Sequence, residues 1–206
     1  MSVMTPTSTP GGAAAGKPLW LRLSHWLTAV AVVLLTLSGW KIYNASPLFG
    51  FRFDRDFTIG GWLGGALLWH FAAMWLLMAS FALYLVMNLV TGRGLTQFFP
   101  LSPAAVWRDL TAALRGRLVH DDSGRYNAVQ KLAYLGVVLL LATAIVSGLV
   151  VWKSVQFPLL RALVGGYDSA RIVHFAAMAG LVGFFIVHVV MVVLVPKSLR
   201  TMIRGH

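Results

Sequence analysis

Four long apolar stretches, separated by polar segments, dominate the pattern of hydrophobic and polar positions along this chain. They run over residues 19–43, 61–90, 126–152 and 171–195. Each is long enough to cross a lipid bilayer as a single helix, for which about 20 apolar residues suffice. A longer polar connector, residues 91–125, separates the second stretch from the third. The pattern predicts an all-α integral membrane protein in which residues 18–206 form one bundle of four transmembrane helices.

The segments outside these stretches carry weaker signals. Residues 1–17 are rich in Pro, Gly, Ser, Thr and Ala and contain no apolar core, so we expect a disordered tail rather than a cleavable signal peptide. In the connector, Ser102-Pro103 can begin a helix whose apolar residues recur at helical spacing. Such a helix would either lie on the membrane surface or link the spans through water. No convincing internal repeat is apparent along the chain.

Composition supports a membrane protein and limits its chemistry. Of the 206 residues, 58% are hydrophobic and 11% are charged, and there is no cysteine. The lack of cysteine excludes Cys-ligated iron–sulfur clusters, thioether-attached haem, thiolate catalysis and disulfides. The formal net charge of +11 arises from short loops between the spans rather than from one basic patch. We therefore expect no nucleic-acid binding.

Lysine and arginine are distributed unequally between the two ends of the predicted bundle. Eleven lie on the side that holds both termini and the connector, and six lie on the other side. Cytoplasmic loops of membrane proteins are the ones enriched in Lys and Arg. The distribution predicts a multi-pass protein of a bacterial inner membrane, with both termini in the cytoplasm.

Two histidines, His174 and His188, interrupt the last apolar stretch and lie 14 residues apart. At about 100° and 1.5 Å per residue, they fall within roughly 40° of each other around one helix and about 21 Å apart along it. One helix face therefore carries an imidazole near each side of the membrane. A single intramembrane histidine can serve only to hydrogen-bond a neighbouring helix, but ionisable groups at this depth are costly and usually functional.

Two other spans offer partners at the same two depths. His25 lies near the cytoplasmic start of the first span, and His70 lies near the periplasmic start of the second. The alternating direction of the spans then pairs His25 with His188 and His70 with His174. His120 and His206 lie in polar segments, where we expect ordinary surface residues.

Paired imidazoles at each depth favour two non-covalent haem b groups, each with six-coordinate iron. Zinc, copper or nickel also bind imidazole, but a tetrahedral site usually needs three or four ligands and each depth offers two. Arg22 and Arg171 each lie three residues before one of these histidines, where they could bind haem propionates. The alternative for both arginines is interfacial snorkelling.

From Trp20 to Arg204 the chain resembles the bacterial di-haem cytochrome b561 and hydrogenase-type cytochrome b group, which includes the membrane subunit of respiratory formate dehydrogenase. The resemblance rests on LSHW around His25, the lone His70, the 14-residue spacing of the last two histidines, and RYNAVQKLAY at residues 125–134. That last segment is similar to the YNxxQK stretch of formate-dehydrogenase-type subunits, which contributes to a quinone site near the cytoplasmic haem.

The resemblance implies a quinone site that includes Asn127, Gln130 and Lys131. Read alone, Asn127 and Gln130 lie three residues apart and present donors and acceptors to one helix face. A quinone carbonyl could use them. The alternative is that Asn127 caps the helix and Lys131 snorkels to the interface.

On these grounds the sequence predicts electron transfer across the inner membrane between the quinone pool and a periplasmic redox subunit. The resemblance implies a molybdopterin oxidoreductase or a hydrogenase as that subunit, and the chain could also form a homodimer. One alternative is a stand-alone superoxide:quinone oxidoreductase of cytochrome b561 type, for which periplasmic basic residues such as Arg52 and Arg55 would attract the anion. Another is a transition-metal transporter that uses the histidines.

Overall fold

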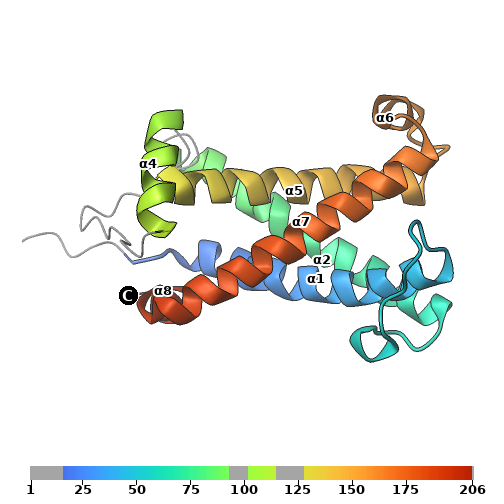
Figure 1. Cartoon of the computed structure of the whole chain (residues 1–206), viewed down its shortest axis with the longest axis horizontal. Coiled ribbons are helices and arrows are strands. Elements are labelled where there is room, and N and C mark those ends of the chain that lie inside the picture. The colour runs from blue at the N-terminus through green and yellow to red at the C-terminus, as the bar shows by residue number, and fades with distance from the viewer. Residues whose placement is uncertain (1–15, 93–101, 115–127, 206) are drawn as a thin grey trace, which may run out of the picture.

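The computed structural model describes residues 16–92, 102–114 and 128–205, and four long helices dominate it (Figure 1). These are α1 (Leu19–Ala45), α2 (Leu63–Val90), α5 (Ala128–Trp152) and α7 (Tyr167–Leu194). All four have the length and apolar composition needed to cross a membrane. The predicted four-helix membrane bundle is therefore confirmed, and its helix ends differ from the expected ones by a few residues.

The largest difference is the start of α7, which begins at Tyr167 rather than at Arg171. The polar residues Asp168 and Ser169 precede the apolar run and form the first turn of the same helix. Asp168 is favourable there because the positive end of the helix dipole lies at the N-terminus. Gly165 and Gly166, both at positive φ, turn the chain into this helix from the short helix before it.

Shorter helices occupy the segments between and after the spans. These are η1 (Arg55–Phe57), α4 (Pro103–Leu114), α6 (Pro158–Val164) and α8 (Pro196–Arg204). Three of them begin at a proline, whose missing N–H would be unpaired in the first turn in any case. The sequence predicted α4, whereas α6 and α8 were not expected.

The bundle is built from two antiparallel hairpins. α1 packs closely on α2, and α5 packs closely on α7, whereas the backbones of one hairpin hardly approach those of the other. α7 runs obliquely across the bundle in Figure 1. α4 lies across the first turns of α5, where the carboxylate of Asp109 accepts a hydrogen bond from the N–H of Ala128 (2.9 Å). That carboxylate occupies the N-terminal end of α5, which helix dipoles make favourable for anions.

The interior of the bundle contains few large side chains. Its hydrophobic centre consists of one residue from each long helix: Ala31, Leu77, Leu141 and Leu181. Apart from alanines, the side chains that are almost completely inaccessible are Val150 and four serines, namely Ser24, Ser38, Ser80 and Ser147. Larger apolar side chains, among them Leu35, Phe81 and Leu140, pack around this centre without being fully buried.

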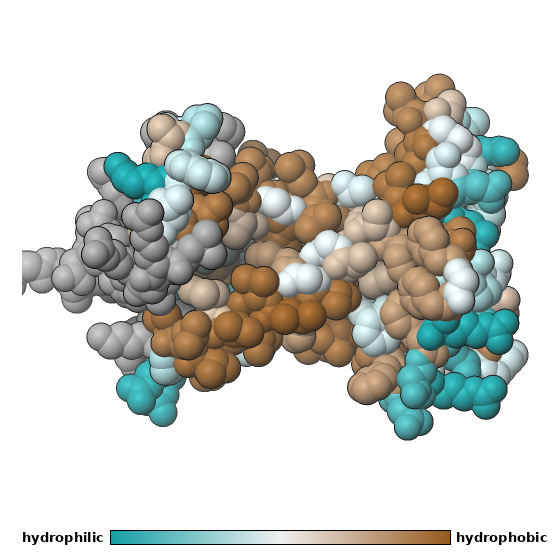
Figure 2. Space-filling view, in the orientation of Figure 1, coloured by the Kyte–Doolittle hydropathy of each residue, from teal (hydrophilic) through white to brown (hydrophobic). Residues whose placement is uncertain are grey.

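Large apolar side chains instead cover the outside of the bundle. Leu68, Leu89 and Val193 are more than 70% exposed. Figure 2 shows a broad hydrophobic band around the middle, with hydrophilic side chains gathered at the end that carries the α1–α2 loop. A contiguous apolar surface of this extent is typical of a surface that faces lipid.

Candidate functional site

The structure brings the four intramembrane histidines together as two pairs. His25 of α1 faces His188 of α7, with ring centroids 5.9 Å apart and an interplanar angle of 63°. His70 of α2 faces His174 of α7, with centroids 6.3 Å apart and an angle of 67°. Each pair joins one hairpin to the other. His120 and His206 lie outside the residues that the structure describes.

The two pairs are separated along the bundle by its apolar centre. Leu181 lies seven residues from both histidines of α7, and Leu77 lies seven residues after His70 on α2. Seven residues are about two helical turns, or roughly 10 Å. The pairs are therefore distinct sites near opposite ends of the spans.

Ser38 of α1 fixes the imidazole of His70. The Ser38 hydroxyl lies 2.6 Å from the carbonyl oxygen of Leu34, which can only accept a hydrogen bond, so the single hydroxyl proton points there. The same hydroxyl oxygen lies 3.0 Å from Nδ1 of His70 and therefore accepts a proton from it. Nδ1 of His70 thus carries the hydrogen, which leaves the lone pair of Nε2 available to a metal.

Ser147 of α5 repeats this arrangement at His174. Its hydroxyl donates to the carbonyl oxygen of Thr143 (2.6 Å). Nδ1 of His174 lies 3.2 Å from the Ser147 hydroxyl oxygen and 3.0 Å from the carbonyl oxygen of Ala144. Two acceptors at one nitrogen require that it carries the proton, so Nε2 of His174 is again the free nitrogen.

A glycine follows each of these serines and makes room for the ring. A Cβ atom on Gly39 would lie 3.4 Å from Cε1 of His70, and one on Gly148 would lie 3.1 Å from Cε1 of His174. The same Ser-Gly pair therefore cradles one histidine in each hairpin. An SG dipeptide, at 38–39 and 147–148, is the sequence feature that these two sites share.

Aromatic rings, rather than serines, surround the His25–His188 pair. The ring of Phe184 stacks on His188 with centroids 5.7 Å apart, and Trp26 contacts His25 edge-on at 5.4 Å. Hydrogen bonds to α8 hold this end of α1. Trp26 Nε1 donates to the carbonyl oxygen of Met202 (3.2 Å), and Arg22 donates to the carbonyl oxygens of Met202 and Ile203.

The two arginines proposed for haem propionates bind backbone carbonyls in this structure. Arg22 joins α1 to α8, as above. Arg171 donates to the carbonyl oxygen (2.6 Å) and the hydroxyl (3.2 Å) of Ser46, the residue directly after α1. Each guanidinium thus ties α1 to another helix, a role that the sequence did not indicate.

The residues proposed for a quinone lie at the start of α5. Asn127 falls outside the described part of the chain. Gln130 is exposed and Lys131 is half-buried. Figure 1 shows the first turns of α5 and α1 at the same end of the bundle as α8. Gln130 and Lys131 are therefore near the end that carries the His25–His188 pair.

The histidine pairs fit a group whose metal is held between two imidazoles. Metal–imidazole bonds are about 2 Å long, so two imidazoles on opposite sides of one metal have centroids about 6 Å apart. Both observed separations agree with this value. Within the described residues no three His, Asp or Glu side chains gather, so a zinc-type ligand set does not form there.

Two buried polar atoms, Trp40 Nε1 and Ser154 Oγ, lack a hydrogen-bond partner within the described structure. Trp40 comes after Ser38 and Ser154 comes after Ser147, so both atoms lie toward the same end of the bundle. Buried hydrogen-bond donors are normally paired.

Comparison with known proteins identifies the family. Residues 17–205 match the family described as "Prokaryotic cytochrome b561". The chain is also 56% identical over 189 residues to a protein of Azospira oryzae (strain ATCC BAA-33 / DSM 13638 / PS) named "Putative protein-methionine-sulfoxide reductase subunit YedZ1". That alignment covers 92% of this chain and 96% of the relative. The chain therefore belongs to the prokaryotic cytochrome b561 family and is a membrane protein that binds haem b.

Proposed function

We propose that this chain is the haem-bearing membrane subunit of a methionine sulfoxide reductase system, taking electrons from quinol and passing them to a soluble reductase. The observation that carries the proposal is the pair of two-histidine sites on α7, one near each end of the spans. The close similarity to a protein named as a reductase subunit supports the substrate class.

The two histidine pairs would each hold one haem b, which when bound supplies an iron centre that carries one electron at a time. His25 and His188 are the proposed ligands of one haem, and His70 and His174 of the other. Ser38 and Ser147 hold the Nδ1–H tautomer of the second pair, so that both Nε2 lone pairs point away from the cradle. Ligation of this kind would account for the presence of one histidine of α7 in each pair.

The spacing of the two sites suits electron transfer across a membrane. Histidines 14 residues apart on α7 lie about 21 Å apart along the helix, against a hydrocarbon layer roughly 30 Å thick. The apolar layer of Ala31, Leu77, Leu141 and Leu181 between them excludes water from the path. A chain with these two sites can therefore connect redox partners on opposite membrane faces.

Quinol oxidation is proposed at the start of α5. Asn127, Gln130 and Lys131 would hydrogen-bond a quinone carbonyl or quinol hydroxyl next to the His25–His188 site. Each quinol releases two electrons and two protons. Reduction of a sulfoxide consumes two electrons and two protons and yields a thioether and water, so the two half-reactions balance.

The charge distribution of the sequence supports an orientation in a bacterial inner membrane with both termini in the cytoplasm. The His70–His174 site then faces the periplasm, where the soluble reductase would bind. The sequence resemblance implied a molybdopterin oxidoreductase or a hydrogenase at this position. The name of the relative favours a reductase that acts on methionine sulfoxide over a hydrogenase.

A stand-alone superoxide:quinone oxidoreductase is the second candidate, because Lys41, Arg52 and Arg55 line a pocket between the end of α1 and the start of α2, toward the end of the bundle nearest His70. One experiment separates the two functions. The chain is purified in mild detergent from its own host, reduced with quinol, and mixed with methionine sulfoxide and any protein that copurifies. Re-oxidation that requires a copurified reductase supports the subunit. A lone chain that reduces quinone with superoxide, and binds no reductase, supports the alternative.

A further inference from the structure

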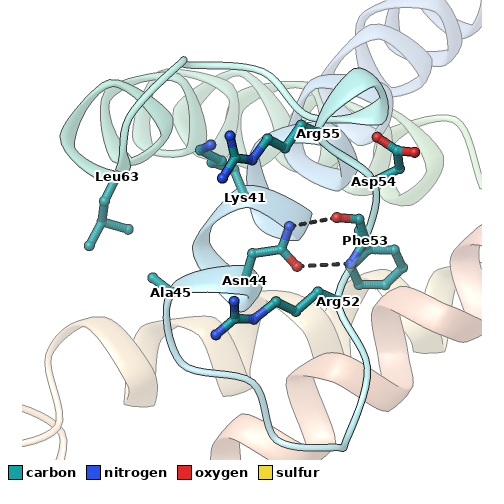
Figure 3. Close-up of a pocket in the computed structure, with 8 residues that line it drawn as sticks. All are labelled: Lys41, Asn44, Ala45, Arg52, Phe53, Asp54, Arg55 and Leu63. Carbon is teal, nitrogen blue, oxygen red and sulfur yellow. Dashed lines mark hydrogen bonds between the residues drawn. The ribbon is translucent and has the colours of Figure 1, made fainter.

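A basic pocket lies between the end of α1, the following loop and the start of α2 (Figure 3). It has a volume of about 450 Å³. Three of its lining side chains are cations, Lys41, Arg52 and Arg55, whereas Asp54 is its single acid. In Figure 3 Lys41 and Arg55 lie close together, and the carboxylate of Asp54 points away from them.

The loop that presents the two arginines is held in a defined conformation. The side-chain amide of Asn44 donates to the carbonyl oxygen of Phe53 (2.8 Å) and accepts from its N–H (2.9 Å). The ring of Phe53 stacks on Trp40, with centroids 4.6 Å apart and an angle of 11°. Phe53 lies directly between Arg52 and Asp54, so these contacts fix the backbone on which the cations are mounted.

The cations of this pocket are not neutralised within the described structure. Lys41, Arg52 and Arg55 form no ion pair or side-chain hydrogen bond there. The carboxylate of Asp54 instead accepts from the N–H of Asp56 (3.1 Å) and caps η1. Unpaired cations in a fixed geometry form a receptive site for carboxylates, which guanidinium groups bind bidentately.

Membrane insertion gives no reason for cations at this place. In the proposed orientation the loop is short and periplasmic, and such loops are depleted in Lys and Arg relative to cytoplasmic ones. The pocket also faces the polar end of the bundle, beyond the hydrophobic band of Figure 2. A ligand in water therefore explains the three cations better than lipid does.

The pocket is close to the His70–His174 site along the chain. Lys41 lies three residues after Ser38, which holds His70, and Leu63 of the pocket lies two turns before His70 on α2. A protein bound here would rest beside the histidine pair that faces its side of the membrane. Close approach to that pair is what electron delivery to a soluble partner requires.

We propose that this pocket receives acidic side chains of the soluble reductase subunit and so docks it beside the His70–His174 site. The inference rests on the proposed function, because it needs that subunit as the partner. Charge complementarity of this kind raises association rates and fixes the orientation of the partner, and it weakens with salt.

The test compares two variants in nanodiscs. The triple variant Lys41→Gln, Arg52→Gln, Arg55→Gln removes the pocket cations. The control Arg161→Gln removes an exposed cation of α6 at the same end of the bundle. Both are accepted only if haem content and reduction by quinol equal those of the wild type. The affinity for the host's methionine sulfoxide reductase catalytic subunit is then measured at low and high salt.

We expect the triple variant to bind about tenfold more weakly at low salt and to lose most of its salt dependence, as three exposed ion pairs would predict. The control should bind within about twofold of the wild type. Equal binding by triple variant and wild type would overturn the docking site and leave the proposed function standing. A wild-type chain that does not bind the reductase would overturn both.

The same experiments test two other possible ligands of the pocket, a lipid headgroup and superoxide. If the loss of affinity disappears in discs without anionic lipid, the pocket binds a lipid headgroup and the proposal is wrong. If the triple variant slows superoxide oxidation while reductase binding is unchanged, the pocket belongs to the alternative enzyme and the proposal is again wrong.

Discussion

Ser38 Oγ lies 3.0 Å from Nδ1 of His70 while its own proton is directed to the carbonyl oxygen of Leu34, 2.6 Å away. Ser147 stands in the same relationship to His174 in the other hairpin. The proton on each Nδ1 is therefore assigned by the chemistry of its neighbours. Hydrogen bonds of this kind orient metal-ligating histidines and raise their basicity.

Ser38→Ala should raise the midpoint potential of the haem proposed for His70 and His174. Ser147→Ala should raise it less, because Nδ1 of His174 keeps the carbonyl oxygen of Ala144 as an acceptor at 3.0 Å. A ligand whose hydrogen bond is lost or weakened becomes a weaker donor and stabilises ferric iron less. One hydrogen bond corresponds to a shift on the order of 20–60 mV. Spectroelectrochemical titration measures it, and the other haem should keep its potential.

Ser80→Ala is the matched control for these variants. Ser80 is also buried and donates to a carbonyl oxygen, that of Leu77 (3.0 Å), but it forms no hydrogen bond to a histidine among the described residues. Its variant should leave both potentials unchanged. Equal shifts in the Ser80 and Ser38 variants would show that burial of a hydroxyl, and not its bond to imidazole, sets the potential.

Gly148→Ala should reduce occupancy of the His70–His174 site. The added Cβ would lie 3.1 Å from Cε1 of His174, which is closer than such atoms normally approach. Relieving this contact costs about 1–3 kcal/mol if the ring must shift. Gly183→Ala on α7 meets nothing within 4 Å and is the control. The haem-to-protein ratio and the far-UV circular dichroism spectrum distinguish ligand displacement from unfolding. Normal haem content in Gly148→Ala would show that the His174 ring does not depend on the space beside Gly148.

Four single alanine variants test the assignment of ligands to sites. His25→Ala and His188→Ala should abolish the same haem signal, and His70→Ala and His174→Ala should abolish the other. Low-temperature absorption spectra and redox titration separate the two signals. Loss of one signal in His25→Ala and of the other in His188→Ala would show that the facing rings of the structure do not share a metal.

Replacement of Asn127 and Gln130 by leucine should slow electron exchange with quinone by an order of magnitude or more while both haems are retained. Each lost hydrogen bond to a quinone oxygen is worth about 1 kcal/mol. Stopped-flow reduction with a quinol analogue gives the rate, and pigment content gives the control. An unchanged rate would remove this segment from the quinone site.

The fold and the histidine pairs could be predicted from the lengths and order of the apolar segments along the chain. Apolar length predicted the spans, and alternating span direction placed each histidine at a depth, so His25 could be matched with His188 without coordinates. The same rules do not specify which side chains hydrogen-bond to an imidazole ring. Ser38 and Ser147 resemble any small residue that lets helices approach, and only their position against Nδ1 distinguishes them.

Residues with long side chains were less predictable for a related reason. Arg22 and Arg171 each lie three residues before a histidine, but a guanidinium can reach many acceptors, and in the structure both bind backbone carbonyls. α8 was not expected, although Leu199, Met202 and Ile203 recur at helical spacing after Pro196 and were its visible signal. Its contact with the start of α1 depends on the path of α7, which no local pattern encodes.

The central claim is that two imidazole pairs on one bundle hold two haems, so the decisive measurement is the haem b content of the purified wild-type chain. Alkaline pyridine extraction gives the amount of haem, and amino-acid analysis of the same sample gives the amount of protein. The proposed sites predict two haem b per chain, and a ratio of one or none would contradict them.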